Sequence, residues 1–95
     1  MIYVISYDIE SDRMRTKLAK LLEGYGVRIQ YSVFECSLTG QQFKKLYKEV
    51  LKLTTKDCPG SVRFYSLCKN CAERTVTIGK PIHDLIQRDQ EIVVI

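Results

Sequence analysis

The chain has 95 residues, of which 45% are hydrophobic and 27% are charged, and its formal net charge is +4. This length and balance predict one globular domain and exclude a disordered chain. The longest apolar run is too short to span a membrane and no basic leader precedes it, so we expect a cytoplasmic protein without a membrane partner. The modest positive charge permits a nucleic-acid partner without requiring one.

The first predicted element is a strand over residues 2–8, which are apolar except for Ser6 until a closing carboxylate and are rich in β-branched and aromatic types. Ser11 or Asp12 can cap the helix that follows. Gly24 and Gly26 supply its stop. The apolar positions at helical spacing are Met14, Leu18, Leu21, Leu22 and Tyr25.

Residues 28–38 are strand-like, but their apolar positions change phase. One face would carry Ile29, Tyr31 and Val33, and the other would carry Phe34, Cys36 and Leu38. A period of two cannot flip within an unbroken strand, so we predict two short strands that meet near Ser32.

The second helix begins with Thr39-x-x-Gln42, which is a capping-box pattern. Its apolar stripe consists of Phe43, Leu46, Tyr47, Val50 and Leu51. A turn at Pro59-Gly60 then predicts a strand over residues 61–67.

The order β-α-β-β-α-β predicts an α+β fold of the ferredoxin-like kind, in which two amphipathic helices cover one face of an antiparallel sheet. Residues 73–79 alternate apolar and polar side chains and predict a fifth strand, so residues 1–79 form one domain. Residues 80–95 form a C-terminal extension, and its apolar end, residues 91–95, needs a sheet edge to pair with. The uncovered face predicts a symmetric homodimer in which this extension packs on the partner subunit.

The four cysteines give a weak signal for a metal or redox site. Cys68 and Cys71 form one C-x-x-C, but Cys36 and Cys58 do not form the second pair that structural zinc sites usually have. A thioredoxin-like site would place the motif after the first strand rather than late in the chain. We interpret Cys68 and Cys71 as packed or turn-flanking thiols, with the zinc and redox alternatives open.

Asp8 is the main candidate for chemistry, because it ends the first strand, where side chains project into a site. A carboxylate there suits Mg²⁺ or Mn²⁺ in phosphodiester hydrolysis, and a two-fold axis nearby would add a second carboxylate. Glu10 either supports it or is solvated. Asp8 as a helix cap is an equally good interpretation of the residues alone. The lone His83 and the absence of a G-x-S-x-G motif argue against covalent catalysis.

Basic and aromatic residues near Asp8 are candidates for nucleic-acid contact. The basic ones are Arg13, Arg15, Lys17, Lys20 and Arg28. Phosphate contact is one interpretation for them and a solvated helix face is the other. Tyr7 and Phe34 are able to stack bases, although core packing is the preferred interpretation.

Several motifs, taken in order, resemble those of the CRISPR-associated protein two (Cas2) family of the spacer-acquisition module. They are Y-D-I at the end of the first strand, R-x-K in the first helix, Y-G-x-R-x-Q, S-V-F-E, and later SVRFYSLCKNC and TVTIG. The resemblance implies a ferredoxin-like homodimer whose C-terminal strands reach the partner sheet. It also implies a metal-dependent endonuclease for RNA or double-stranded DNA, with Mg²⁺, or Mn²⁺ in its place, held between the two Asp8 side chains.

The resemblance carries roles to seven positions. It makes Tyr7, Asp8 and Ser32 catalytic residues, with Asp8 also the metal ligand. It makes Arg15, Lys17, Arg28 and Phe34 nucleic-acid-binding residues, although Lys17 stands where some members have arginine.

The same family offers a second role, a non-catalytic dimeric scaffold that bridges copies of an integrase subunit and binds duplex DNA. Nuclease activity is then dispensable or absent. A toxin-like ribonuclease of related fold is a third hypothesis. An RNA-recognition module shares the sheet topology, but its aromatic signature is missing.

Overall fold

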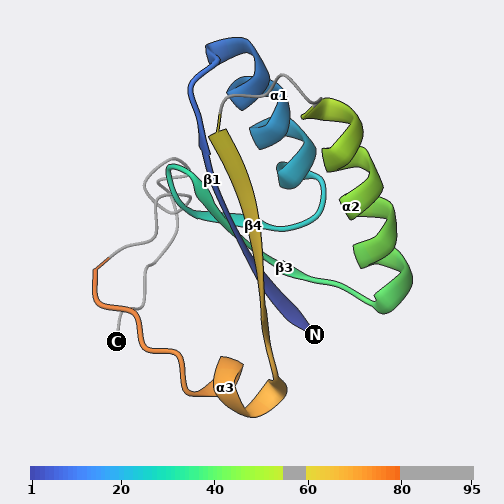
Figure 1. Ribbon diagram of the computed structural model, residues 1–95. Helices are drawn as coiled ribbons and strands as arrows, with labels where there is room; N and C mark the ends of the chain where they lie inside the picture. The colour runs from blue at the N-terminus through green and yellow to red at the C-terminus, as the bar shows by residue number, and fades with distance from the viewer. Residues whose placement is uncertain (55–59, 80–95) are drawn as a thin grey trace.

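The structure is a computed structural model that describes residues 1–54 and 60–79 (Figure 1). Its elements are β1 (Ile2–Ile9), α1 (Asp12–Glu23), β2 (Val27–Gln30), β3 (Val33–Ser37), α2 (Gly40–Leu53), β4 (Gly60–Leu67) and α3 (Lys69–Glu73). The α+β class is confirmed, and the first six elements follow the predicted order. The strands form one antiparallel sheet in the order β2-β3-β1-β4, so β1 is central and β4 is an edge.

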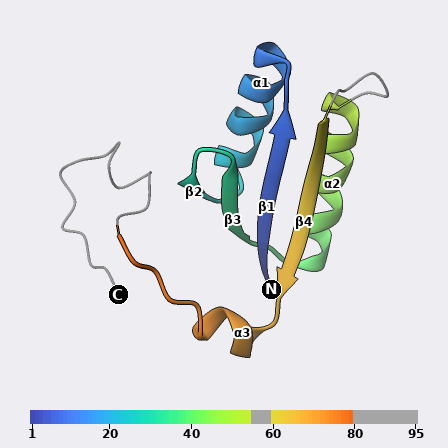
Figure 2. The same cartoon turned by 60° about the vertical axis from the view of Figure 1, so that its left-hand side comes forward.

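Helices α1 and α2 lie on the same side of the sheet, and no described element covers the other side (Figure 2). Alternation along β1 turns Ile5, Tyr7 and Ile9 toward the helices, where they are buried. The largest fully buried side chains come from both layers and are Phe34, Ile5, Leu18, Leu22, Leu46 and Cys36. The hydrophobic core therefore lies between the helices and one face of the sheet.

Both long helices have the N-cap residues that the sequence predicts. The Ser11 hydroxyl accepts a hydrogen bond from the Met14 N–H at 3.2 Å and caps α1. At α2, the N–H of Gln42 donates to Thr39 Oγ1 and the N–H of Thr39 donates to Gln42 Oε1, which completes the capping box. The predicted cap at Ser11 and the capping box are confirmed.

The predicted change of phase is also confirmed, because β2 ends at Gln30 and β3 begins at Val33. The register shifts between Arg28 and Gln30, which marks an irregularity in the pairing of the two strands. At the start of this hairpin the backbone passes close to β3. A Cβ on Gly26 would lie 2.2 Å from the carbonyl oxygen of Glu35, so this position has no room for a side chain.

The predicted fifth strand over residues 73–79 is wrong. Residues Lys69–Glu73 form the short helix α3, and residues 75–79 have no regular secondary structure. Alternating polarity describes a strand only when a neighbouring strand accepts its hydrogen bonds, and no strand among the described residues pairs with this segment. The predicted extension, residues 80–95, lies outside the described residues. None of the helices in the described part is long and apolar enough to cross a membrane.

One hydrogen bond joins the end of α1 to α2 and gives a first prediction. The Tyr25 hydroxyl donates to Glu49 Oε1 at 2.6 Å, and this hydrogen bond, together with burial and the carboxylate charge, raises the pKa of Tyr25. Tyr25→Phe is expected to lower the free energy of unfolding by about 1 kcal/mol at neutral pH, as measured by urea denaturation.

The control for this prediction is Tyr47→Phe, which removes a hydroxyl from a half-exposed ring of α2 and should change stability by less. Because the folded-state pKa of Tyr25 is raised, the hydrogen bond contributes fully below pH 10 and is lost as the pH rises through that pKa. The difference between Tyr25→Phe and wild type should therefore shrink above pH 10. A constant difference would show that the hydroxyl acts in another way.

Candidate functional site

Asp8 is the centre of the candidate site and lies one residue before the end of β1. Tyr7 and Ile9 on either side are buried, so the Asp8 side chain lies on the uncovered face, where it is exposed. Within residues 1–54 and 60–79 its carboxylate makes no hydrogen bond or ion pair. Because Ser11 caps α1, the cap interpretation of Asp8 is wrong, and its carboxylate is available to a ligand.

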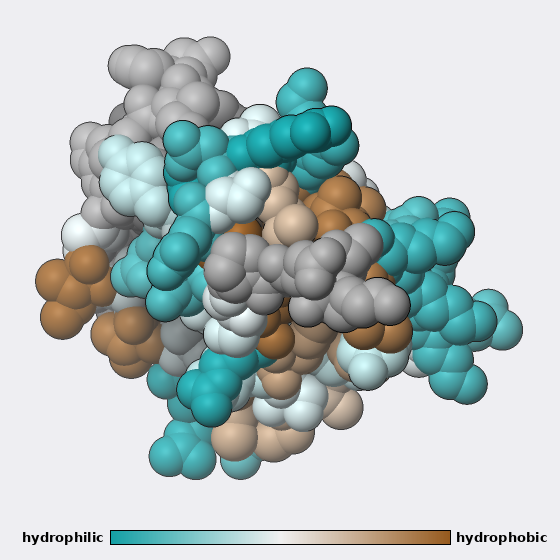
Figure 3. Space-filling view, turned by 45° about the horizontal axis from the view of Figure 1, so that its top comes forward, coloured by the Kyte–Doolittle hydropathy of each residue, from teal (hydrophilic) through white to brown (hydrophobic). Residues whose placement is uncertain are grey.

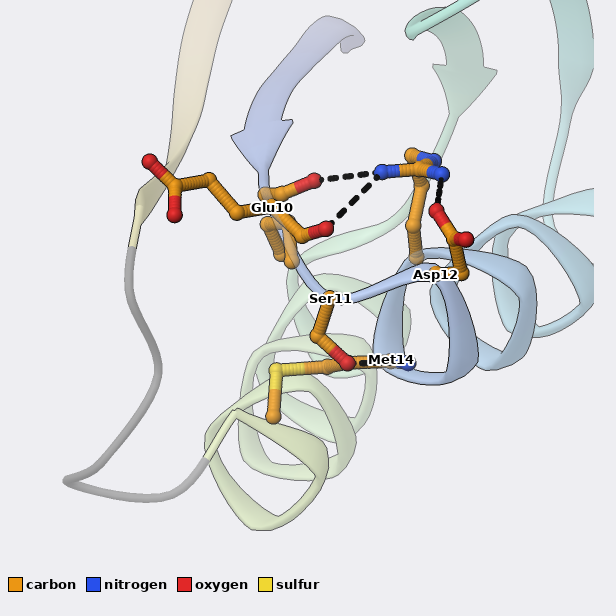
Figure 4. A network of polar contacts seen from close by, with 6 residues as sticks. Glu10, Ser11, Asp12 and Met14 are labelled. Atoms are coloured by element: carbon orange, nitrogen blue, oxygen red, sulfur yellow. Dashed lines mark hydrogen bonds and ion pairs between the residues drawn. The ribbon is translucent and has the colours of Figure 1, made fainter.

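Arg15 binds the link between β1 and α1 through its side chain; Figure 4 shows this link, with Glu10, Ser11 and Asp12 labelled. Its Nη1 donates to the carbonyl oxygens of Ile9 at 2.8 Å and Glu10 at 3.4 Å, and its Nη2 pairs with the Asp12 carboxylate. The guanidinium thus fixes the backbone directly after Asp8. The Glu10 side chain points away from Arg15, and Glu10 lies beyond the last residue of the strand.

Tyr7, Ser32 and Phe34 support the site from the core side. The Tyr7 N–H donates to the Ser32 carbonyl at 3.1 Å, and the Tyr7 hydroxyl donates to the Tyr31 carbonyl at 3.3 Å. The Phe34 ring is fully buried and its centroid is 6.4 Å from that of Tyr7. Neither ring is available to a base in this structure, which supports core packing for both aromatic residues.

Arg28 and Lys17 differ in their surroundings. The Arg28 guanidinium lies 5.3 Å from the centroid of the Phe34 ring, a cation–π contact on the helix side of the sheet. Its Nε is buried and lacks a hydrogen-bond partner among the described residues. Lys17 is exposed on α1. A single chain therefore places the Arg28 guanidinium and the Asp8 carboxylate on opposite faces of the sheet.

The cation nearest to Asp8 in the strand register is one that sequence reasoning missed. Ser61 is the cross-strand partner of Asp8, and Arg63 is the partner of Ser6, so Asp8 and Arg63 lie in adjacent rows of the uncovered face. Arg63 Nη1 donates to the Tyr65 hydroxyl at 3.0 Å, which holds the guanidinium over this face. The alternation of side chains within residues 61–67 could have placed Arg63 on one face of a strand. Only the register between β1 and β4 shows that this face also carries Asp8.

One chain offers a single carboxylate for a cation at this site. Among the described residues, no group of three His, Cys, Asp or Glu side chains comes together, and His83 lies outside them. Mg²⁺ prefers hard oxygen donors, keeps several waters and takes one or two protein carboxylates. The donor chemistry of Asp8 therefore fits Mg²⁺, and a second copy of Asp8 would complete a two-carboxylate set.

Cys68 is the N-cap of α3 and Cys71 lies within this helix; both are exposed, so neither is a packed thiol. The Cys71 N–H donates to Cys68 Sγ at 3.4 Å and lowers the pKa of Cys68, whereas contact with Cys68 raises the pKa of Cys71. By contrast, burial raises the pKa of Cys36 to about 11.

The thiolate is the nucleophile in alkylation, so a lower pKa means faster reaction at pH 7.5. We therefore expect iodoacetamide to modify Cys68 before Cys71. Cys36 should react about 100-fold more slowly than Cys68. Peptide mass spectrometry of time points measures the order. In urea, where the thiols lose their environments, the three rates should become similar. Equal rates for Cys36 and Cys68 in the folded protein would contradict the assignment.

The sequence matches the family model described as CRISPR associated protein Cas2 over residues 1–75. A protein of Synechocystis sp. called CRISPR-associated endoribonuclease Cas2 3 is 46% identical over 80 residues, which cover 84% of this chain and 86% of that one. A protein of Thermus thermophilus called CRISPR-associated endoribonuclease Cas2 is 43% identical over 76 residues, 80% of each chain.

Solved structures show the same similarity. The crystal structure of Streptococcus pyogenes Cas2 at pH 6.5 matches with a TM-score of 0.71 and 33% identity, over 83% of this chain and all of that one. A chain of a partial Cas6-RT-Cas1–Cas2 complex matches with the same TM-score and identity, over 99% of this chain and 96% of that one.

Proposed function

Since the chain belongs to the CRISPR-associated Cas2 family, we propose that it is a metal-dependent endonuclease of the CRISPR spacer-acquisition machinery, acting on phosphodiester bonds of RNA or double-stranded DNA. The observation that carries this proposal is the exposed Asp8 carboxylate, which has no partner within the described residues. The names of the relatives, which call them endoribonucleases, support it.

In this proposal the residues of the chain have three kinds of role. Asp8 holds Mg²⁺, or Mn²⁺ in its place. Arg63 binds substrate phosphate on the same face, while Arg15 fixes the backbone after Asp8. Tyr7 and Ser32 keep β1 and the β2–β3 turn together. When bound, the cation would supply an activated water and neutralise charge on the phosphate.

A symmetric homodimer belongs to the proposal because it would provide a second Asp8. The uncovered face carries half-exposed or exposed Val27 and Tyr65 beside Ile2, Val4 and Leu67, which are only partly buried. A monomeric protein rarely leaves such an apolar face in water, so this surface supports a second copy as its cover.

The edge at β4 supports the proposed place of the C-terminal extension. Figure 3, which brings the top of the Figure 1 view forward, shows apolar side chains in the middle of this end of the molecule, with hydrophilic ones projecting on the right, over α2. A hollow of about 350 Å³ between α2 and β4 is lined by Tyr47, Leu51 and Phe64 among others. No described strand pairs with the outer edge of β4, and such an edge next to an apolar hollow suits residues 80–95 of the partner subunit.

Metal removal tests the catalytic part of the proposal. EDTA is expected to stop cleavage of RNA or duplex DNA by the purified protein, and excess Mg²⁺ or Mn²⁺ is expected to restore it, because Asp8 alone cannot activate water at neutral pH. The assay follows labelled substrates by gel electrophoresis. Undiminished cleavage in EDTA would reject the metal site.

A scaffold that bridges integrase subunits on duplex DNA is a second candidate function. The match of almost the whole chain to a chain of a complex named for Cas1 and Cas2 favours it. Spacer acquisition in cells that carry Asp8→Asn separates the two functions. Acquisition at the wild-type rate assigns the biological role to the scaffold, and its loss assigns it to the carboxylate.

A further inference from the structure

A recess on the helix side of the sheet, remote from the face that carries Asp8, has the features of a separate ligand site. It measures about 330 Å³ and lies between α1 and the β2–β3 hairpin. Helix α1 contributes Arg15, Lys20 and Glu23 to its lining, and the sheet side contributes Arg28 and Tyr31. A volume of this size is at the lower end of the range for small-molecule pockets, roughly 300–1,000 Å³.

The recess is rich in cations without carboxylate partners. Lys20 and Arg28 make no ion pair within the described part of the chain, whereas Arg15 pairs with Asp12, outside the recess. Glu23 is the single carboxylate in the lining. Among the described residues Arg28 Nε is buried without an acceptor, which leaves the terminal nitrogens of this guanidinium as the groups a ligand could contact. These groups favour an anion with several acceptor oxygens.

An aromatic ring accompanies the cations. Tyr31 is 79% exposed, and its carbonyl accepts the hydrogen bond of the buried Tyr7 hydroxyl, so its backbone is anchored while its ring faces solvent. An exposed ring beside cations is the combination that binds a base by stacking and its phosphate by charge.

We propose that this recess binds the phosphomonoester end of a nucleic-acid strand, with the phosphate at Lys20 and Arg28 and the terminal base on Tyr31. A recess accepts a group that ends there more readily than a chain that passes across it. A monoester carries a charge of about −1.5 to −2 at pH 7, which suits two unpaired cations better than the single charge of an internal diester. The proposal rests on the proposed function only in taking nucleic acid as the ligand.

Short single-stranded oligonucleotides with a 5′-phosphate, a 3′-phosphate or hydroxyls at both ends test this inference. Binding is measured by fluorescence anisotropy in EDTA, with the label on an internal base. One phosphorylated form is expected to bind about tenfold more tightly than the hydroxyl form, because it adds charge-assisted hydrogen bonds. Equal affinity for all three would overturn the proposal. Since no metal is present, failure to cleave and failure to bind are separate results.

Matched variants locate the effect. Lys20→Gln changes an exposed residue and should reduce the preference for the phosphorylated end to about twofold. The control is Lys48→Gln, which makes the same change at an exposed position of α2 and should leave the preference near tenfold. Glu23→Gln should increase affinity by removing the one opposing charge. A similar loss in Lys20→Gln and Lys48→Gln would mean general charge attraction and would also overturn the proposal.

Tyr31→Ala separates stacking from charge. It should weaken the phosphorylated and hydroxyl oligonucleotides by the same factor, about fivefold or more, because base stacking does not depend on the terminal phosphate. Far-UV circular dichroism checks that the exposed substitution leaves the fold intact. No change in affinity for either oligonucleotide would exclude the ring from the site.

Discussion

Asp8→Asn is expected to lower cleavage by about 100-fold or more, because cation binding supplies several kcal/mol of transition-state stabilisation and each 1.4 kcal/mol is a factor of ten. The amide keeps the size of the side chain but loses the charge that holds a divalent cation. Initial rates on labelled RNA and duplex DNA at saturating Mg²⁺ measure the effect. The fold should be unaffected, since the carboxylate is exposed and makes no hydrogen bond among the described residues.

Two controls test whether a loss of cleavage comes from the Asp8 carboxylate itself. The thermal midpoint and the mass in solution of Asp8→Asn should equal those of wild type, which excludes unfolding and loss of a dimer. Glu10→Gln, a charge-neutralising change just beyond the strand, should retain most of the activity because its side chain points away from the Arg15 cluster. Cleavage by Asp8→Asn at the wild-type rate would show that the activity does not depend on this carboxylate.

Gly60→Ala is expected to destabilise the fold strongly. Gly60 has φ +135°, a conformation that residues with a Cβ rarely adopt, and its ideal Cβ would lie 2.0 Å from the Asp8 carbonyl oxygen. Strain of about 1–3 kcal/mol and a comparable overpacking term should lower the thermal midpoint by 10 °C or more. Because the clash falls on the backbone of Asp8, activity should fall as well at temperatures where the variant remains folded.

Gly40→Ala is the matched control for this substitution. It adds the same methyl group at the start of α2, where an ideal Cβ meets no atom within 4 Å. Alanine favours the helix, so this variant should be neutral or slightly more stable than wild type. Scanning calorimetry of the two variants compares them directly. Similar midpoints for both would mean that the chain at Gly60 shifts easily.

The elements that could be predicted are those whose signals are local. Ser11 caps α1, and Thr39 with Gln42 starts α2, because the hydrogen bonds involved span only three residues. The flip of the apolar phase located the break between β2 and β3 near Ser32 in the same way. Each of these features is decided by neighbours in the sequence.

Features that depend on a partner in space could not be predicted. Residues 73–79 alternate like a strand, but a strand also needs a neighbour, and residues 1–54 and 60–79 provide none there. Asp8 and Arg63 share the uncovered face because of the β1–β4 register, and register is a tertiary property. Arg15 was expected to bind phosphate, yet the turn after β1 brings backbone carbonyls within its reach.

The pairing of β1 with β4 also has a kinetic consequence. These strands are neighbours in the sheet, although α1, β2, β3 and α2 separate them along the chain. Closing so long a loop carries an entropic cost that must be met before the pairing stabilises anything, which slows folding. During synthesis, β1 can pair with β3 first, but its other side lacks a partner until residues 60–67 leave the ribosome. Until then, the nascent polypeptide lacks Ser61 and Arg63, the residues of β4 that lie beside Asp8 on the uncovered face.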